Sequence, residues 1–460
     1  MAIFSRCFAI FTGFLLAGCG QKLPDLDKRN SIFFYGDVVN VSANIANIPN
    51  INSRNVDISH NSSRYDSNQI NYSFQGDYKI NQTKSLDSYG FSYFMVDKSP
   101  VYYKGNGLEL VFIIGQNGNI ASYSPGAEKI SIFFSNAKKN FLFGNIDIEG
   151  DCIIYTTNQG FVRLINIKTG SVIWEKYKPE YSFYSGGVSS EGVFYAHGAN
   201  GSLYAISLQN GEELWRYKPA ARLDFGGGGI ETMIDSARPV IYQDIIAYAT
   251  KSNTLDFIGK AYGNLIFSTK LDNTAKANKS IGQTIFSVDH PIFSPLLTNS
   301  LLLTSSMYSG LHIIDPRDGR IRDIKSFGVN SPIIASENFA YLITNDADLV
   351  CISTHNGEIK WTYKLDNFRN YIMPKYLNNG KSVKKVKLNW RGPISVNNDI
   401  IVVSPFGKML AIDANTGGDA RAIDIPECVF SSPTIADNTI YLYNSCLGEM
   451  IIMNGKISHD

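Results

Sequence analysis

From about residue 100 onward, the chain alternates short apolar runs with clusters of turn-forming residues. The runs are rich in β-branched and aromatic residues, and the turn signals recur about every eight to twelve positions. Aromatic residues make up 12% of the chain, which favours β structure further. The pattern predicts an all-β fold built from many short strands.

The runs also repeat in a fixed register. Five segments share an apolar residue eight positions before a turn glycine, and in four of them an aromatic residue follows that glycine by four. The aromatic positions are Trp174, Trp215, Phe267 and Trp361. A second landmark, an X-Pro pair, precedes most units and suits the first residue of a strand. These pairs are Ser99-Pro100, Arg238-Pro239, Ser294-Pro295, Ser331-Pro332, Gly392-Pro393 and Ser432-Pro433.

With the weaker units included, eight repeats are present. A four-stranded unit of about 40 residues cannot bury both faces of its sheet alone, whereas radial stacking buries both and protects the edges. We therefore predict an eight-bladed β-propeller of four-stranded antiparallel blades. An open solenoid is the competing array. The three tryptophans in one phase are expected to pack between blades.

The last repeat lacks its fourth strand, because the chain supplies one more strand after Gly448 and then stops. A segment near the N-terminus should complete it and close the ring. The alternation of Ile70, Tyr72 and Phe74 makes residues 69–75 the first candidate, and residues 91–96 are the second.

The N-terminus carries one positive charge followed by about ten apolar residues, as in a secretory signal. The signal ends in Leu-Ala-Gly before Cys19, and this order resembles the lipobox of bacterial lipoproteins. We predict a signal peptide over 1–18, a lipidated Asn/Ser-rich tether over 19–68 and the propeller over 69–460. Gly20 resembles the signal for release to the outer membrane, on its periplasmic side. A plain signal peptide with an unrelated cysteine is the alternative.

Charge and cysteine usage narrow the function classes. Lys and Arg number 42 against 41 Asp and Glu, so no nucleic-acid partner is implied. No CxxC pair occurs and the six histidines are spread singly, which predicts no metal site. Cys351 is expected to be a small buried residue. Cys428 and Cys446 are expected on one face of the last blade, either as a disulfide or as two free thiols.

Three long insertions, at residues 216–238, 268–294 and 362–392, link one blade to the next and should emerge on one face. Loops on a rigid scaffold are where binding is usually built. Residues 375–387 of the last insertion hold five lysines, and Leu388, Trp390 and Arg391 follow them. We predict partner binding by these three residues; the alternative is a solvated basic loop with Trp390 packed against a blade.

The repeats resemble blades of the pyrroloquinoline-quinone type, which occur both in quinoprotein dehydrogenases and in non-enzymatic lipoproteins. Such dehydrogenases need a calcium site, a catalytic Asp and usually a vicinal disulfide, and no Cys-Cys pair exists here. We therefore predict that the protein is not an enzyme and takes no cofactor.

Lipobox, tether and eight repeats together resemble BamB-type assembly lipoproteins, and details such as Gly186-Gly187 and Trp390–Pro393 resemble alphaproteobacterial members. The resemblance implies a scaffold that binds a BamA-like outer-membrane barrel subunit and also extended strands of unfolded outer-membrane proteins. In such lipoproteins a Leu-x-Leu-Arg-Gly element meets BamA, and Leu388, Trp390 and Arg391 match its spacing, although they precede blade seven and not blade four. A lipoprotein with a different envelope partner and a dehydrogenase are the alternatives.

Overall fold

The computed structural model describes most of the chain beyond residue 78. The described residues are 79–86, 99–115, 118–135, 144–183, 186–198, 200–219, 237–250, 254–271, 294–298, 300–305, 310–365, 368–372, 383–388, 390–396, 398–436, 439–445 and 447–454. The predicted signal, the predicted lipidation residue Cys19 and the predicted tether lie outside them. Among the described residues, no helix is long and apolar enough to cross a membrane.

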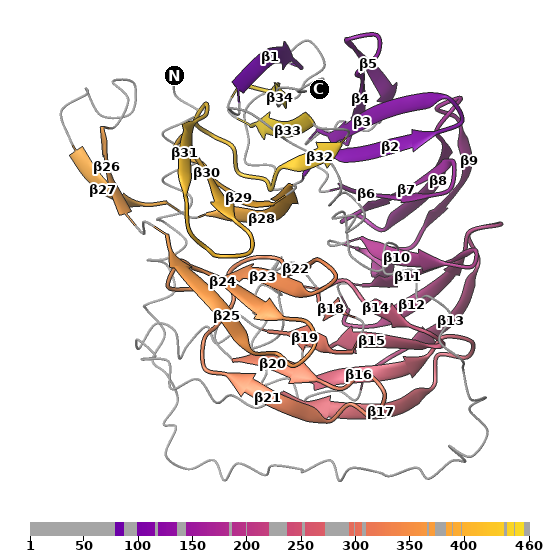
Figure 1. Ribbon diagram of the computed structural model, residues 1–460. Coiled ribbons are helices and arrows are strands. Elements are labelled where there is room, and N and C mark those ends of the chain that lie inside the picture. The colour runs from indigo at the N-terminus through magenta and orange to yellow at the C-terminus, as the bar shows by residue number, and fades with distance from the viewer. Residues whose placement is uncertain are drawn as a thin grey trace, which may run out of the picture. The chain divides into compact units, whose positions relative to one another are not determined.

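Eight four-stranded antiparallel sheets follow one another around a ring, which confirms the predicted propeller (Figure 1). Blades 1 to 4 are formed by β2 (Val101–Gly105), β3 (Leu108–Ile114), β4 (Ile120–Ser124), β5 (Lys129–Phe134); β6 (Gly144–Glu149), β7 (Cys152–Thr157), β8 (Phe161–Asn166), β9 (Val172–Tyr177); β10 (Gly187–Ser190), β11 (Val193–His197), β12 (Leu203–Ser207), β13 (Glu213–Tyr217); and β14 (Val240–Tyr242), β15 (Ile245–Ala249), β16 (Thr254–Gly259), β17 (Leu265–Lys270). A short 3-10 helix, Pro179–Tyr181, links blades 2 and 3.

The second half of the ring repeats this order. Blades 5 to 8 are formed by β18 (Leu296–Leu297), β19 (Leu302–Thr304), β20 (Leu311–Ile314), β21 (Ile321–Lys325); β22 (Ile334–Ala335), β23 (Phe339–Ile343), β24 (Asp348–Ser353), β25 (Ile359–Lys364); β28 (Arg391–Val396), β29 (Asp399–Ser404), β30 (Lys408–Asp413), β31 (Arg421–Asp424); and β32 (Thr434–Ala436), β33 (Thr439–Asn444), β34 (Glu449–Asn454), β1 (Lys79–Ser85). A ninth sheet pairs β26 (Phe368–Ile372) with β27 (Val383–Lys387) outside the blades.

Ring closure uses a different N-terminal segment from the two expected. β1 pairs antiparallel with β34 as the outermost strand of blade 8, from Lys79 opposite Asn454 to Ser85 opposite Glu449. Residues 69–75 and 91–96 lie outside the described residues, and Lys79–Ser85 takes the role assigned to them. Strong apolar alternation does not mark this strand, because an outermost strand is half exposed and its sequence is largely polar. Its apolar anchor is the next residue, Leu86, which is fully buried.

Burial within each blade follows strand position. The second and third strands are almost entirely buried, whereas the outermost strands alternate between exposed and half-buried residues, as in β9, β17 and β25. Cys351, on the third strand of blade 6, is fully buried, as predicted. The core is therefore a series of apolar layers between neighbouring sheets rather than one central mass.

The repeated aromatic and the repeated turn glycine contact each other across the blade boundary. The indole Nε1 of Trp215 donates to Lys260 O in blade 4 at 3.0 Å, and Trp174 and Trp361 make the equivalent bonds to Leu208 O and Ala414 O. The turn glycine of the next blade lies directly against the indole: a Cβ on Gly263 would stand 2.4 Å from the Trp215 side chain. The prediction that these tryptophans pack between blades is confirmed.

Candidate partner-binding surface

The element predicted to bind a partner lies where the chain enters blade 7. Leu388 and Trp390 are each only 3% exposed, and both belong to the apolar layer between blades 6 and 7 that also holds Trp361. The Leu388 carbonyl accepts a hydrogen bond from Ser404 Oγ at 2.6 Å. Their side chains therefore serve the packing of the ring.

Arg391 has a different position, because it bridges two blades. Its Nε donates to Phe430 O at 3.0 Å, and the next residue, Gly392, donates its N–H to Ser432 Oγ at 3.2 Å. Both acceptors lie just before blade 8. Arg391 is half-buried, so of the three residues it keeps the most contact with solvent. Binding of a partner by this element stays a prediction.

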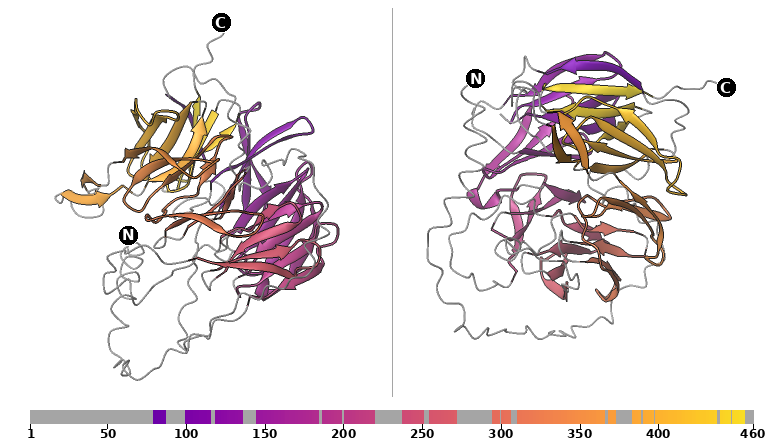
Figure 2. Two further views of the ribbon diagram at one scale, coloured as in Figure 1. Left: turned by 60° about the horizontal axis from the view of Figure 1, so that its bottom comes forward. Right: turned by 90° about the vertical axis from the view of Figure 1, so that its left-hand side faces the viewer.

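The ninth sheet leads directly into this element. β26 and β27 pair antiparallel with Phe368 opposite Lys387 and Ile372 opposite Val383. Buried residues lie on either side of the pair in the sequence: Leu365 precedes it and Leu388 follows it, and both belong to the apolar layer between blades 6 and 7. The left view of Figure 2 draws the hairpin apart from the blades. The lysine-rich part of the insertion thus contains a β-hairpin that is bounded in the sequence by buried residues.

A buried ion pair near the first strands was not anticipated from the sequence. Arg238 Nη1 lies 2.5 Å from Asp147 Oδ1, with side-chain exposures of only 11% and 9%. Arg238 also donates to Gly187 O, and the Gly187 N–H donates to Asp147 Oδ2 at 3.1 Å. Gly186 makes room for the pair, since a Cβ there would stand 2.5 Å from Asp147 Oδ2. One ion pair therefore joins blades 2, 3 and 4.

In the sequence, the position of Arg238 marks the start of a strand and gives no indication of its partner Asp147. Arg238 stands in the position before proline that Ser occupies in four of the six X-Pro pairs. Its backbone N–H donates to Ser294 Oγ of the next such pair at 3.0 Å, and Thr434 Oγ1 donates to Pro100 O across the closure between blades 8 and 1. Residues at the X-Pro positions thus take part in contacts between the first strands of neighbouring blades.

A second polar cluster ties the link between blades 2 and 3 to β13. Glu213 accepts hydrogen bonds from Tyr181 at 2.8 Å, Lys178 at 3.0 Å and Arg216 at 3.0 Å. Burial pushes the pKa of Glu213 upward, but the hydrogen bonds from these three residues outweigh it and lower the pKa to about 2. Glu213 is therefore ionised throughout the physiological range.

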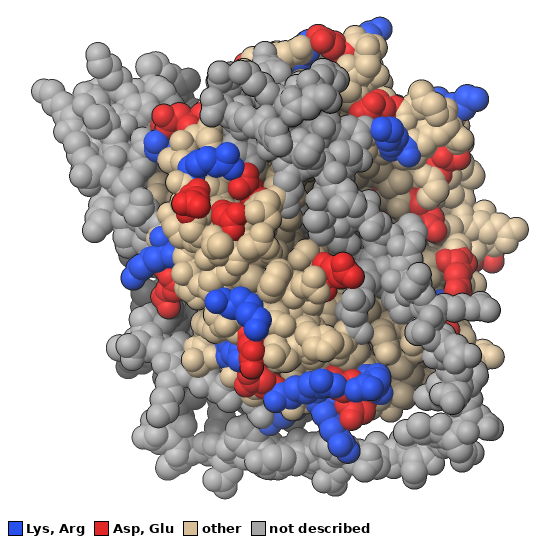
Figure 3. All heavy atoms as spheres, viewed as in Figure 1, with Lys and Arg blue, Asp and Glu red and all other residues tan. Residues whose placement is uncertain are grey.

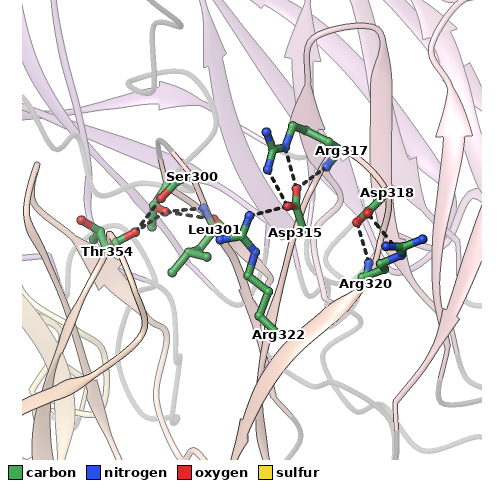
Figure 4. A network of polar contacts seen from close by, with 9 residues as sticks. Ser300, Leu301, Asp315, Arg317, Asp318, Arg320, Arg322 and Thr354 are labelled. Carbon is green, nitrogen blue, oxygen red and sulfur yellow. Dashed lines mark hydrogen bonds and ion pairs between the residues drawn. The ribbon is translucent and has the colours of Figure 1, made fainter.

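The turn between β20 and β21 holds the cluster drawn in Figure 4. Asp315 accepts hydrogen bonds from Arg317 at 2.7 and 2.9 Å and from Arg322, and these bonds hold the pKa of Asp315 well below its usual range (Figure 4). Asp318 and Arg320 form a more exposed pair on the same turn. On the face drawn in Figure 3, positive and negative side chains of the described residues lie interspersed in this way.

Of the cysteines in the described residues, Cys152 and Cys351 are free and Cys428 is disulfide-bonded. Its partner sulfur lies outside the described residues. The Cys428 carbonyl accepts a hydrogen bond from Ser445 N at 3.1 Å, which places Cys428 beside the residue that precedes Cys446. Pairing of Cys428 with Cys446 stays a prediction, and two free thiols in the mass spectrum of the unreduced protein would contradict it.

Within the described part of the chain, no group of three or more His, Cys, Asp or Glu side chains is placed to hold a metal ion. His197 and His312 are buried in different blades, and His355 is exposed on a turn. The four-glycine run at 226–229 lies outside the described residues.

Comparison with known proteins agrees with this architecture. A family model described as outer membrane protein assembly factor BamB matches residues 109–223 and 148–363. The outer membrane protein assembly factor BamB of Moranella endobia is 21% identical over 252 residues, which cover 54% of this chain and 61% of that protein. The chain thus spans less than two thirds of the length of that relative.

Solved structures share the fold. The crystal structure of BamB from Moraxella catarrhalis superposes with a TM-score of 0.60 at 14% identity, covering 82% of this chain and all of that one. The computationally designed Ika8 protein superposes with a TM-score of 0.56 at 10% identity, covering 79% and 98%. Because the BamB family model matches more than half of the chain, the protein belongs to the BamB family of outer-membrane protein assembly factors.

Proposed function

We propose that the protein is a non-enzymatic scaffold of the outer-membrane β-barrel assembly machinery, which binds the BamA-like barrel subunit and assists insertion of outer-membrane proteins. Family membership carries this proposal. A ring whose blades are joined by buried apolar layers and by the Arg238–Asp147 pair is a rigid support for binding loops.

Affinity capture from detergent-solubilised envelopes tests the proposal. The tagged full chain should recover a BamA-like barrel subunit in stoichiometric amount. Recovery of another envelope protein without that subunit would favour a lipoprotein with a different partner. Dye-linked alcohol oxidation together with a quinone absorbance would instead support a dehydrogenase.

The anchor belongs to the same proposal. We infer that Cys19 is lipidated and holds the protein on the periplasmic side of the outer membrane, because a diacylated cysteine anchors by its buried methylenes. Metabolic labelling with a fatty acid should mark the wild-type protein and leave the Cys19→Ser variant unmarked. A labelled Cys19→Ser protein would refute this assignment.

For contact with the barrel subunit, we propose the element of Leu388, Trp390 and Arg391, with Arg391 as the side chain that a partner reaches. The burial of Leu388 and Trp390 supports a role in holding the element in place. Arg391→Ala should reduce capture of the barrel subunit, whereas Arg320→Ala, on a side chain that is 86% exposed, should not. Equal capture by both variants would exclude Arg391.

For extended strands of unfolded outer-membrane proteins, we propose the outermost strands β9, β13 and β17. Among the described strands, each has one edge without a sheet neighbour, and each exposes an apolar residue directly before its repeated aromatic. These residues are Ile173, Leu214 and Ile266, at 51%, 54% and 39% exposure. Such an edge can take up an added strand through main-chain hydrogen bonds.

A photo-crosslinking amino acid distinguishes these edges from others in the ring. At the Leu214 position it should capture unfolded outer-membrane protein. At Lys360, which occupies the equivalent position on β25, capture should be weaker. Equal capture at the two positions would count against strand addition at blades 2 to 4.

A further inference from the structure

A β-bulge recurs directly before the repeated aromatic position in the outer strands of blades 2 to 6. In blade 3, Trp215 lies opposite Ala205 and Glu213 lies opposite the next residue, Ile206. Leu214, between them, has no residue opposite it. The other four blades show the same shift. A bulge interrupts regular pairing along an edge, so a further strand can pair regularly only with the residues that follow the bulge.

Backbone hydrogen bonds show which of these residues turn outward. Four residues after the repeated aromatic of blade 6, Leu365 donates its N–H to Ala347 O, and the equivalent residue of blade 2 makes the same bond within its own blade. Alternate residues of an antiparallel strand turn their N–H and C=O to the same side. The residues one and three positions after the aromatic therefore turn both groups to the outer edge. In β13 these residues are Arg216 and Lys218.

The two outward residues of β13 differ in how their charges are compensated. Arg216 donates to Glu213 at 3.0 Å and lies 3.6 Å from Glu180, so carboxylates already compensate its charge. Lys218 is exposed and forms no ion pair with the described residues. Residues directly opposite each other on neighbouring strands share a face, and opposite charges at such positions attract. Lys218 therefore favours an acidic residue on an incoming strand.

Two edges combine this lysine with an exposed apolar residue. Among the described outer strands, β13 and β17 each expose an apolar bulge residue and a lysine four positions later. These residues are Leu214 and Lys218 in β13, and Ile266 and Lys270 in β17. β9 has an apolar bulge residue but tyrosine at the lysine position, and β25 has lysine at both positions. The edges of β13 and β17 thus offer an apolar contact at one end and a cation at the other.

We propose that these two edges select extended segments with an acidic residue opposite Lys218 or Lys270 and an apolar residue that reaches Leu214 or Ile266. This inference rests on the proposed addition of strands to these edges and specifies which segments are taken up. Neighbouring strands are antiparallel in every blade, and an incoming strand continues that order. Its acidic residue then comes first, and its apolar residue follows three or four positions later.

Carbodiimide crosslinking tests where the acidic residue lies, because it joins a carboxylate to an amine that is in contact with it. The probe is a labelled extended peptide of about ten residues, with one aspartate and leucines three and four positions after it. The full chain is incubated with the probe, and tryptic mass spectrometry identifies the coupled lysines. Coupling at Lys218 and Lys270 should exceed coupling at Lys168 and Lys364, which are also exposed. A peptide with the reverse order of aspartate and leucines should couple less.

Fluorescence anisotropy of the same peptide measures the contribution of the charge. Lys218→Gln combined with Lys270→Gln should weaken binding about two- to fivefold, as expected for one cross-strand charge pair at each edge. Lys168→Gln combined with Lys364→Gln is the matched control, since it changes the net charge equally and should leave binding within about 1.5-fold. With asparagine in place of the peptide's aspartate, the two double variants should bind equally, because the charge pair is then absent from both.

Two outcomes would overturn the selection of acidic segments. One is equal coupling at Lys218 and Lys364, and the other is equal loss of binding in both double variants, which would mean that net charge alone determines binding. A peptide methylated on the amide nitrogen opposite Arg216 tests strand addition itself, and it should bind about tenfold more weakly because a main-chain hydrogen bond is lost. Unchanged binding of the methylated peptide would refute strand addition as well. Capture of the barrel subunit is measured independently of both.

Discussion

The buried pair of Arg238 and Asp147 should contribute strongly to the stability of the ring. Arg238→Met keeps much of the side-chain volume but removes the guanidinium that lies 2.5 Å from Asp147 Oδ1. Asp147 then retains only the Gly187 N–H of the contacts described above, at 3.1 Å. Removing one partner of a buried pair typically costs about 3–5 kcal/mol, because the other charge stays buried without compensation.

The expected change is measurable by thermal unfolding. For a folded unit of roughly 380 residues, with an unfolding entropy of about 2 cal/mol/K per residue, this loss lowers Tm by about 4–6 °C. Arg320→Met is the matched control, since that side chain is 86% exposed and its pair with Asp318 should contribute less than about 1 kcal/mol.

A double-mutant cycle separates the pair from general damage. Asp147→Asn leaves the arginine without its carboxylate and should also destabilise the protein. The double variant should lose much less than the sum of the two single losses, because neither charge is then left alone. Additive losses, or a Tm for Arg238→Met equal to that of Arg320→Met, would refute the assignment of stability to this pair.

Three further predictions concern the blade boundary, acid stability and ring closure. Gly263→Ala should lower the free energy of unfolding, measured in urea, by about 2 kcal/mol or more, because φ is +67° and the new Cβ would stand 2.4 Å from Trp215. Gly150→Ala is the control: its φ is also positive but no atom lies near the new Cβ, so the loss should be only about 1–2 kcal/mol. Glu213, whose pKa is lowered to about 2 in the folded protein, contributes stability that is present above about pH 4.5 and lost as the pH falls toward 2. Glu213→Gln should therefore flatten the fall of the urea midpoint between pH 5 and pH 2.5, and an unchanged slope would exclude this role. Leu86→Ala should cost about 2–5 kcal/mol and expose β1 to limited proteolysis first, and protection equal to that of the unsubstituted protein would contradict a closing role.

The repeat made the ring predictable, because one physical requirement recurs at four blade boundaries, those that follow blades 2, 3, 4 and 6. A bulky aromatic must face a residue without a side chain, so Trp215 and Gly263 leave a periodic trace in the sequence. Contacts that occur once leave no such trace. Arg238 and Asp147 stand 91 positions apart, and nothing in either neighbourhood indicates the other.

The closing strand and the candidate site show two further limits of prediction from the sequence. β1 could not be recognised by apolar alternation because an outermost strand needs little of it, and its one fully buried residue, Leu86, follows the strand. For Leu388 and Trp390, a large apolar residue after a charged insertion fits both a partner contact and a packed base. Only the position of the element between blades 6 and 7 shows that these two side chains are buried.

Closure by β1 also determines when, during synthesis of the chain, the last blade can be completed. Among the described strands, the one synthesised first pairs with the one synthesised last, so Lys79 can pair only after Asn454 has been made, while each of the other seven blades is complete once its own four strands have emerged. Until then, blade 8 has no outer strand and β34 presents an open edge, which is the kind of surface on which chains aggregate. A chain cut short before β34 cannot close its ring at all. Pairing of β1 with β34 therefore marks a closed ring, and a chain that lacks this pairing leaves the edge of β34 accessible to proteases and chaperones.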